Sequence, residues 1–128
     1  MAKPKILVVD DEPDVVKLIE ASLTSDGFEV LKAYDGISAI DVIENERPDL
    51  VLLDLMMPVM SGYEVCEQLK GNPVTHDIPI ICLTSAHAPS VREQSVRLGA
   101  AYVIEKPFLI KELTVQIKRH LRQTQPEQ

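Results

Sequence analysis

Runs of hydrophobic residues are short throughout this 128-residue sequence. None approaches the ~20 residues that a membrane-spanning helix needs, and none has the make-up of a secretion signal. Cysteine is scarce as well, because Cys66 and Cys82 are the only two and they form no motif with each other. Both fit small hydrophobic core positions in a reducing compartment, so we expect a cytoplasmic protein without membrane association.

Basic residues are outnumbered by acidic ones. Lysine and arginine total 13 against 20 aspartates and glutamates, which gives a formal charge of −7 and a pI near 4.9. Nucleic acid is therefore not an expected partner of this domain. The 45% hydrophobic content is ordinary for a folded globular domain. We find no internal repeat or linker, and expect one domain over residues 1–122 with a polar tail or linker stub at 123–128.

Five short aliphatic segments alternate with five helical patterns. Continuous aliphatic runs are typical of strands that are buried on both faces of a parallel sheet. Their alternation with helices over short connections predicts a doubly wound α/β fold, with helices on both faces of one five-stranded parallel sheet. The flavodoxin-like strand order 2-1-3-4-5 suits five units of this size. The predicted strands cover residues 5–9, 28–33, 50–53, 78–83 and 101–104.

The predicted helices begin at recognisable residues. Pro13 suits the first turn of the first helix, and Ser61 with Glu64 has the spacing of a capping box at the third. Ser90 and Glu93 repeat that spacing and predict the start of the fourth helix. The last helix is amphipathic, with apolar residues at steps of three and four: Ile110, Leu113, Ile117 and Leu121.

Residues able to bind a metal ion and a phosphoryl group follow four of the predicted strands. Asp10 and Asp11 follow the first strand, and Asp54 follows the third. Thr84 and Lys106 follow the fourth and the fifth. The carboxyl ends of parallel strands share one edge of a sheet, so these side chains should converge there. Three converging carboxylates repel one another unless a cation joins them, and oxygen ligands favour Mg²⁺. Asp54 would then be a nucleophile aimed at phosphorus, with an ammonium and a hydroxyl beside it.

Each of these residues has an ordinary interpretation when it is taken alone. An acidic pair before a helix, such as Asp10 and Asp11, is usually a cap, and one aspartate at a strand end is commonly a turn residue. A single threonine or Lys-Pro pair says little by itself. The prediction rests on their joint occurrence at four strand ends along one edge of a sheet.

Five short motifs surround these residues: 8–12 (VVDDE), 54–58 (DLMMP) with Gly62, 83–85 (LTS), 99–100 (GA) and 106–108 (KPF). Together they resemble the receiver domain of two-component response regulators, in the CheY-like superfamily. The resemblance covers nearly the whole chain. The spacings of 30 residues from Asp54 to Thr84 and 52 from Asp54 to Lys106 are those expected of this family.

The resemblance implies a phosphorylation-activated signalling module. Asp54 would be the phosphoacceptor, charged by a sensor histidine kinase or a histidine phosphotransfer protein. Mg²⁺ would be bound by Asp11, Asp54 and the backbone carbonyl of Met56, with Asp10 acting through water. The protein would act as a stand-alone regulator or as the receiver part of a larger one. It would be a monomer or a phosphorylation-dependent homodimer.

The resemblance also assigns the residues that respond to the phosphoryl group. Lys106 would pair with it, and the bond from Lys106 to Pro107 is expected to be cis. Thr84 would be the hydroxyl that turns toward the phosphoryl group. The surface changed by this movement would be the fourth helix, the fifth strand and the fifth helix, where a downstream protein would bind.

Two features depart from what the family often carries. The switch aromatic usually lies three residues before the lysine, where this sequence has Val103. Tyr102 precedes it and should point to the opposite face of the sheet, because side chains alternate along a strand. The signal would then run through Thr84 and the backbone of the following loop. Met56 and Ala86 offer no polar side chain to orient a hydrolytic water, so we expect a phosphoryl group that lasts many minutes or longer.

Other functions fit the sequence less well. Phosphohydrolases with an aspartyl-phosphate intermediate typically carry a second aspartate two residues after the nucleophile, where this chain has Met56. We therefore expect no enzyme activity beyond self-phosphorylation from small donors and slow self-dephosphorylation. A flavodoxin-like cofactor binder needs a glycine- and hydroxyl-rich phosphate loop, and Asp10 with Asp11 would repel a phosphate without a metal. A receiver-fold module that binds partners without phosphorylation stays as the alternative.

The chain has three histidines, at His76, His87 and His120. They share no metal-ligand spacing. We expect all three to be solvated at the surface.

Overall fold

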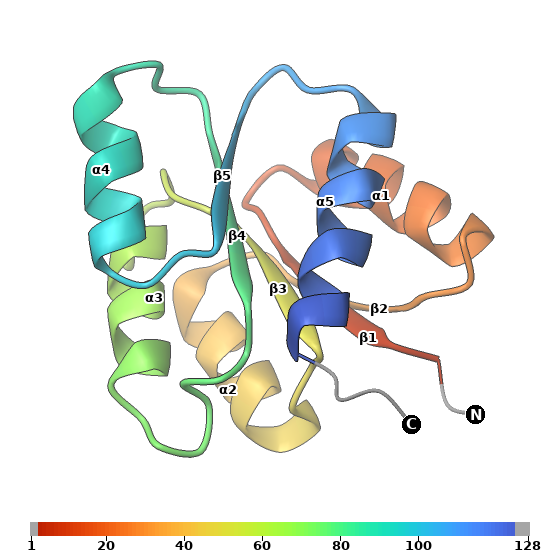
Figure 1. The fold of residues 1–128 in the computed structure, drawn as a ribbon, viewed down its shortest axis with the longest axis horizontal. Helices are drawn as coiled ribbons and strands as arrows, with labels where there is room; N and C mark the ends of the chain where they lie inside the picture. Colours follow the sequence, from red (N-terminus) through yellow and green to blue (C-terminus); the bar gives the residue numbers. More distant parts are fainter. Residues whose placement is uncertain (1–2, 125–128) are drawn as a thin grey trace.

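The structure is a computed structural model that describes residues 3–124, with side chains as far as Leu121. Five strands alternate with five helices along the chain (Figure 1). The strands are β1 (Lys5–Val9), β2 (Glu29–Ala33), β3 (Leu50–Asp54), β4 (Ile80–Thr84) and β5 (Tyr102–Glu105). The helices are α1 (Pro13–Ser25), α2 (Gly36–Glu46), α3 (Gly62–Lys70), α4 (Pro89–Arg97) and α5 (Ile110–Thr124).

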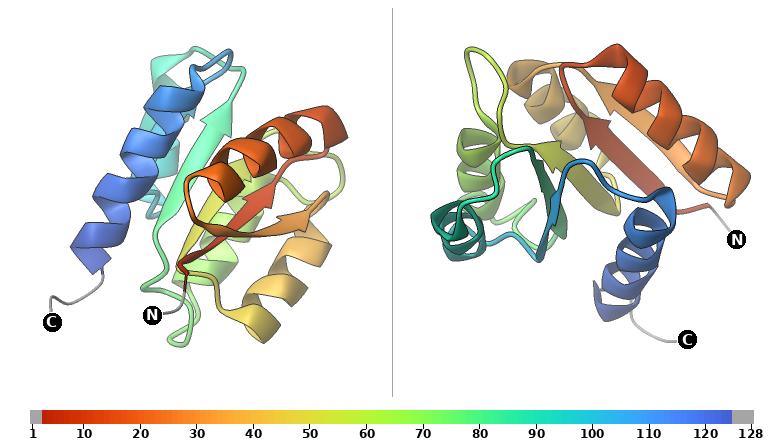
Figure 2. Two further views of the ribbon diagram at one scale, coloured as in Figure 1. Left: turned by 90° about the vertical axis from the view of Figure 1, so that its right-hand side faces the viewer. Right: turned by 90° about the horizontal axis from the view of Figure 1, so that it is seen from above.

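The strands form one parallel sheet in the order β2-β1-β3-β4-β5, as predicted. Helices α1 and α5 cover one face, and α2, α3 and α4 cover the other (Figures 1 and 2). Because every strand runs in the same direction, the carboxyl ends of all five meet at one edge of the sheet. The predicted doubly wound fold is therefore confirmed.

Side chains of each central strand alternate between two cores, one on each side of the sheet. In β1, Ile6 and Val8 pack with residues of α1 and α5, whereas Leu7 and Val9 pack with residues of α2 and α3. Strands β3 and β4 are buried at every position. Full burial of one such aliphatic side chain contributes roughly 1.5–3 kcal/mol. The two cores hold the strands rigidly, and with them the residues at the sheet edge.

The predicted start of the fourth strand is wrong by two residues. The amide of Ile78 donates to the carbonyl of Thr75 in the preceding turn, at 3.0 Å, and is not part of the ladder. Pro79 has no amide hydrogen to donate, and its carbonyl accepts from Val51 at 3.0 Å. The paired register of β4 therefore begins at Ile80.

The capping box predicted for the fourth helix does not form. Ala88 is the N-cap of α4 and has no side-chain oxygen, while Pro89 takes the first helical position. Proline suits that position because its missing amide hydrogen would be unsatisfied there in any case. Ser90 therefore lies inside the helix, and its spacing to Glu93 has no capping role.

Other predicted helix ends agree better with the structure. The box of Ser61 and Glu64 is present at α3, with both reciprocal hydrogen bonds at 3.3 Å. Helix α5 continues to Thr124, past the predicted domain end at 122, and the remainder of the predicted tail, 125–128, lies outside the described residues. No helix within the described residues is long and apolar enough to cross a membrane.

Candidate functional site

Three carboxylates meet at the carboxyl edge of the sheet, as the sequence predicted. Asp10 and Asp11 directly follow β1, and Asp54 is the last residue of β3. One carboxylate oxygen from each lies within 4.8 Å of the others. Asp10 is 0% exposed and Asp54 is 3% exposed, whereas Asp11 faces solvent. The cluster thus combines two buried carboxylates, Asp10 and Asp54, with the solvent-accessible carboxylate of Asp11.

Lys106 supplies the positive charge of this cluster. Its Nζ lies 2.8 Å from Oδ2 of Asp10, 3.6 Å from Oδ2 of Asp54 and 3.7 Å from Oε1 of Glu12. The backbone amide of Lys106 donates to the carbonyl of Thr84 at 2.7 Å, which fixes the start of the following loop. The peptide bond from Lys106 to Pro107 is cis, as predicted. Glu12 belongs to the 8–12 motif, but no role in the cluster was predicted for it from the sequence.

Both oxygens of the Asp10 carboxylate accept hydrogen bonds within the protein. Its Oδ2 accepts from Lys106, and its Oδ1 accepts from the amide of Glu12 at 2.9 Å. The Asp10 amide also donates to the carbonyl of Ala33 at 3.2 Å, beside the end of β2. Asp10 therefore holds the end of β1 in place and presents both oxygens in fixed directions.

Asp54 sits in surroundings that oppose its ionisation. Burial is the main cause that raises its pKa to about 6, and the negative charges of Asp10 and Asp11 raise it further. The amide of Met56 and the ammonium of Lys106 act in the opposite direction. The Met56 amide donates to Oδ1 of Asp54 at 3.1 Å. The protein alone therefore does not neutralise the negative charge of this pocket.

The pKa of Lys106 is raised above its ordinary value. Burial alone would lower it, but the hydrogen bond to Asp10 and the charges of Asp54, Asp10 and Glu12 together outweigh that effect. The ammonium therefore keeps its charge at neutral pH. A fixed positive charge beside a buried carboxylate is the arrangement that favours an incoming anion.

The donor set of this cluster fits a hard divalent cation. All three side chains offer oxygen, and one of them is open to solvent. Carboxylate oxygens with water-accessible positions are typical of Mg²⁺ sites. Met56, the predicted carbonyl ligand, lies two residues beyond Asp54, and its amide is already tied to that aspartate. The cluster could therefore hold a metal ion.

Thr84 is the last residue of β4 and lies at the same edge of the sheet, but its hydroxyl forms a hydrogen bond with the following loop. Its side chain is buried, and its hydroxyl oxygen accepts from the amide of Ala86 at 3.0 Å. The structure thus brings Thr84 to the predicted strand end while its hydroxyl is engaged with the β4–α4 loop. This orientation depends on a local turn that the sequence pattern did not reveal.

The loop from β3 to α3 is packed tightly against Asp54. The amide of Gly62 donates to the carbonyl of Leu55 at 3.0 Å. A Cβ at Gly62 would overlap the carbonyl oxygen of Asp54 and would lie 2.7 Å from Cα of Leu55. Only glycine allows this approach, so Gly62 sets the position of the backbone that carries Asp54.

Residues on β5 face the directions that were predicted. Val103 is buried in the core on the α2–α3–α4 side, and Tyr102 points to the opposite face. The Tyr102 ring contacts the ring of His120, with centroids 5.8 Å apart. His120 is buried, so the prediction that it is a surface residue is wrong. The other two histidines, His76 and His87, are exposed as expected.

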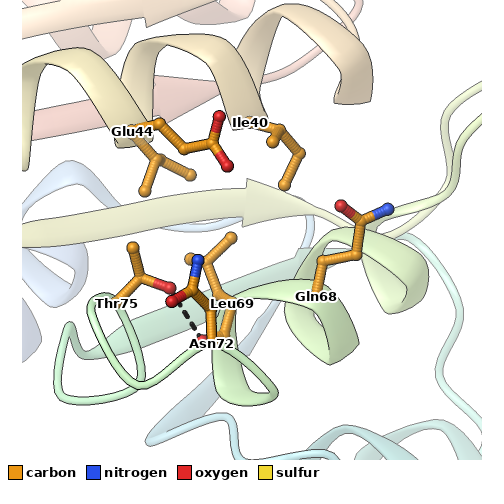
Figure 3. A pocket seen from close by; sticks show the side chains of 7 residues that line it. Ile40, Glu44, Gln68, Leu69, Asn72 and Thr75 are labelled. Atoms are coloured by element: carbon orange, nitrogen blue, oxygen red, sulfur yellow. Dashed lines mark hydrogen bonds between the residues drawn. The ribbon is translucent and has the colours of Figure 1, made fainter.

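A separate small pocket lies between α2 and α3, away from the carboxylate cluster (Figure 3). Its volume is about 50 Å³, well below the roughly 300 Å³ at which sites for drug-sized ligands begin. Figure 3 shows side chains of α2 on one side of the pocket and side chains of α3 and the following loop on the other; the lining residues are Ile40, Ile43, Glu44, Gln68, Leu69, Asn72 and Thr75. We assign no cofactor to this pocket.

The sequence and the fold match known proteins over almost the whole chain. The family model described as the response regulator receiver domain matches residues 6–118. The response regulator MprA of Mycobacterium tuberculosis is 42% identical over 123 residues, which cover 96% of this chain and 53% of MprA. The chain thus spans about half the length of the curated relatives it matches.

Solved structures agree with the sequence match. The chemotaxis protein CheY4 of Vibrio cholerae superposes with a TM-score of 0.87 at 30% identity, over 92% of this chain and 98% of that chain. A signal receiver domain from a signal transduction histidine kinase of Syntrophus aciditrophicus reaches 0.90 at 32% identity, over 98% and 95%. The chain therefore belongs to the response regulator receiver domain family of two-component signalling.

Proposed function

We propose that Asp54 accepts a phosphoryl group from a phosphohistidine on a sensor histidine kinase or a histidine phosphotransfer protein. An oxygen of the Asp54 carboxylate would form the new bond to phosphorus while the bond from phosphorus to the histidine nitrogen breaks. The observation that carries this proposal is the position of Asp54, buried at the sheet edge with the Lys106 ammonium 3.6 Å away. A nucleophile and a fixed positive charge are thus directed at the same space.

We further propose that the acidic cluster works with Mg²⁺. Asp11, Asp54 and the backbone carbonyl of Met56 would hold the ion, and Asp10 would act through water because both of its oxygens are already engaged. When bound, Mg²⁺ neutralises negative charge on the carboxylates and on the phosphoryl oxygens. The raised pKa of Asp54 supports a need for such a cation.

Lys106 would stabilise the phosphorylated state. Its Nζ is already within 3.6 Å of Asp54, and it would donate to a phosphoryl oxygen while staying near Asp10. The Thr84 hydroxyl would become the second donor. We propose that it then turns away from the amide of Ala86, from which it accepts at 3.0 Å. This turn would link the chemistry at Asp54 to the β4–α4 loop.

The downstream partner would bind to the surface formed by α4, β5 and α5. Helix α4, the first element of that surface, follows the loop that begins after Thr84 and contains Ala86. Phosphorylation would therefore change partner binding, and self-association as a homodimer is one form this change could take. The alternative function, partner binding without phosphorylation, predicts a surface that is independent of Asp54.

Intact mass spectrometry tests the phosphorylation step. The protein is incubated with acetyl phosphate or phosphoramidate, first with Mg²⁺ and then with EDTA. We expect the wild type to gain one phosphoryl mass only with Mg²⁺, and Asp54→Asn to gain none. Asp77→Asn is a matched control, because this exposed aspartate lies in the loop between α3 and β4. It should behave as the wild type.

If acetyl phosphate and phosphoramidate do not phosphorylate the protein, a panel of histidine kinases tests whether it accepts a phosphoryl group from a protein donor. Transfer from a kinase to the wild type but not to Asp54→Asn would still support the proposal. Absence of transfer from every donor, together with partner binding by Asp54→Asn, would replace it with the phosphorylation-independent module.

A further inference from the structure

Two polar side chains connect the segment after β4 to the edge strand β5. Nδ1 of His87, in the β4–α4 loop, lies 3.2 Å from Oε1 of Glu105 at the end of β5. Nη1 of Arg92, in α4, donates to the carbonyl of Val103 at 3.5 Å. Both contacts join residues more than ten positions apart in sequence. The loop and the start of α4 are therefore tied to β5 from outside the sheet.

The same loop contains the hydrogen bond that engages Thr84. The Thr84 hydroxyl accepts from Ala86, and His87 is the next residue after Ala86. A hollow of about 280 Å³ lies beside these contacts, between His87 and Arg92 on one side and β5 on the other. The loop thus has open space next to it and is held at His87 by a side-chain contact.

We propose that His87 and Glu105 form a tether that positions the β4–α4 loop with the Thr84 hydroxyl turned toward Ala86. This inference rests on the proposed function, in which Thr84 would turn from Ala86 toward a phosphoryl group on Asp54. The contact between His87 and Glu105 stabilises the loop conformation in which the Thr84 hydroxyl accepts from Ala86. It therefore opposes the turn of Thr84 toward Asp54. His87 is a positioning residue that acts through Thr84. It would connect Asp54 to β5 in a protein that has Val103 where the family usually has the switch aromatic.

The size of the effect follows from the exposure of the pair. The His87 side chain is 59% exposed and that of Glu105 is 41% exposed. Exposed pairs of this kind are worth little, so loss of the tether should shift the loop equilibrium by about two- to fivefold. A carboxylate can accept from Nδ1–H of a neutral or a protonated imidazole, so the contact does not require a charged histidine.

Beryllofluoride, a non-covalent phosphoryl mimic, tests the tether without any kinase. Its apparent affinity is measured by calorimetry in excess Mg²⁺ for the wild type, His87→Ala, Glu105→Gln and the double variant. We expect His87→Ala to bind about two- to fivefold more tightly than the wild type. Adding Glu105→Gln to it should bring no further gain. His87→Gln, which keeps a donor near Glu105, should lie between the wild type and His87→Ala.

The chain offers a matched control and a second readout. His76 forms a pair of the same kind with Asp77, with 3.2 Å between Nε2 and Oδ1, in the loop between α3 and β4. His76→Ala should leave beryllofluoride affinity unchanged. The amide resonance of Ala86 should shift in ligand-free His87→Ala toward its position in the beryllofluoride complex, which a change in stability alone would not produce.

The outcomes separate this inference from the function on which it rests. Equal affinities for the wild type and His87→Ala, with a wild type that does bind, would overturn the tether and leave the phosphorylation proposal standing. Additive gains from His87→Ala and Glu105→Gln would also overturn it. A wild type that takes up no phosphoryl group and no beryllofluoride would remove the proposed function and the tether together.

Discussion

Lys106 and Asp10 form a buried ion pair across the top of the sheet, with 2.8 Å between Nζ and Oδ2. Their strands are not neighbours, because β3 and β4 lie between β1 and β5. The lysine side chain therefore reaches across the ends of β3 and β4, and its Nζ also lies 3.6 Å from Oδ2 of Asp54. One ammonium thus contacts both buried carboxylates, Asp10 and Asp54, at this edge of the sheet.

Removing that ammonium should destabilise the protein measurably. In Lys106→Met the Asp10 carboxylate, which is 0% exposed, would lose its charged partner. Breaking a buried pair costs about 3–5 kcal/mol, and we expect a loss of this size in Lys106→Met. Urea unfolding at pH 7.5 in EDTA measures the change in the free energy of unfolding.

Lys118→Met is the control for this experiment. Lys118 pairs with Asp26 at 3.6 Å, but both side chains are well exposed. Its loss should change the free energy of unfolding by less than about 1 kcal/mol. Equal losses in the two variants would contradict the view that Asp10 depends on Lys106.

Asp54→Asn should stabilise the metal-free protein at neutral pH. Burial and the charges of Asp10 and Asp11 raise the pKa of Asp54 to about 6, from an ordinary value of 3.8. A raised folded pKa means that the folded state binds the proton more tightly than the unfolded chain. The stabilisation from this proton is full below pH 3.8 and is lost as the pH rises through 6. We expect Asp54→Asn to gain about 1–3 kcal/mol over the wild type at pH 7.5.

The pH profile in EDTA checks the sign of that effect. The gain from Asp54→Asn should shrink as the pH falls from 7.5 to 4, because Asp54 then becomes neutral in the wild type as well. Adding Mg²⁺ at pH 7.5 should stabilise the wild type more than the variant. A gain that stays constant from pH 4 to 7.5 would show that ionisation of Asp54 is not its cause.

The fold and the carboxylate cluster were predictable because both depend on the pattern of hydrophobic and polar residues along the chain. Short aliphatic runs such as 50–53 are typical of strands buried on both faces, and the carboxyl ends of parallel strands meet at one edge. Asp10, Asp54 and Lys106 then converge without any knowledge of their side-chain contacts. The sequence alone does not fix the strand order, and the order 2-1-3-4-5 was predicted because it is the natural choice for five βα units of this size.

Features that depend on one local contact were not predictable. The Thr84 hydroxyl is turned by the amide of Ala86, and the pair of His87 and Glu105 depends on the path of two loops. His120 was judged by its polarity, although it lies three residues after Ile117 and so falls on the inner face of α5. Its Nδ1 contacts the carbonyl of Gln116 at 2.8 Å, which makes its burial acceptable.

Gln116 offers a route to a more stable protein. Among the described residues, its Oε1 is the one buried side-chain oxygen or nitrogen without a hydrogen-bond partner. An unpaired buried acceptor costs about 1–3 kcal/mol, and methionine has a similar shape without the polar atom. Gln116→Met should therefore raise the free energy of unfolding by about 1 kcal/mol. Gln68→Met, on the exposed part of α3, is the control and should have almost no effect. A loss of stability in Gln116→Met would mean that its Oε1 is satisfied in solution.

The lifetime of the phosphoryl group should be long and should depend on Met56. This side chain is exposed beside Asp54, and its thioether accepts only weak hydrogen bonds, so it cannot orient a water for attack on phosphorus. Met56→Asn would supply a donor and an acceptor at that point. We expect about tenfold faster loss of the phosphoryl group, below the 10²–10⁴ of a well-placed general base. Mass spectrometry after removal of the donor gives the rate, and Val74→Asn, an exposed position in the α3–β4 loop, should decay as the wild type does. Decay within seconds in the wild type would show that another group in the site already positions the water.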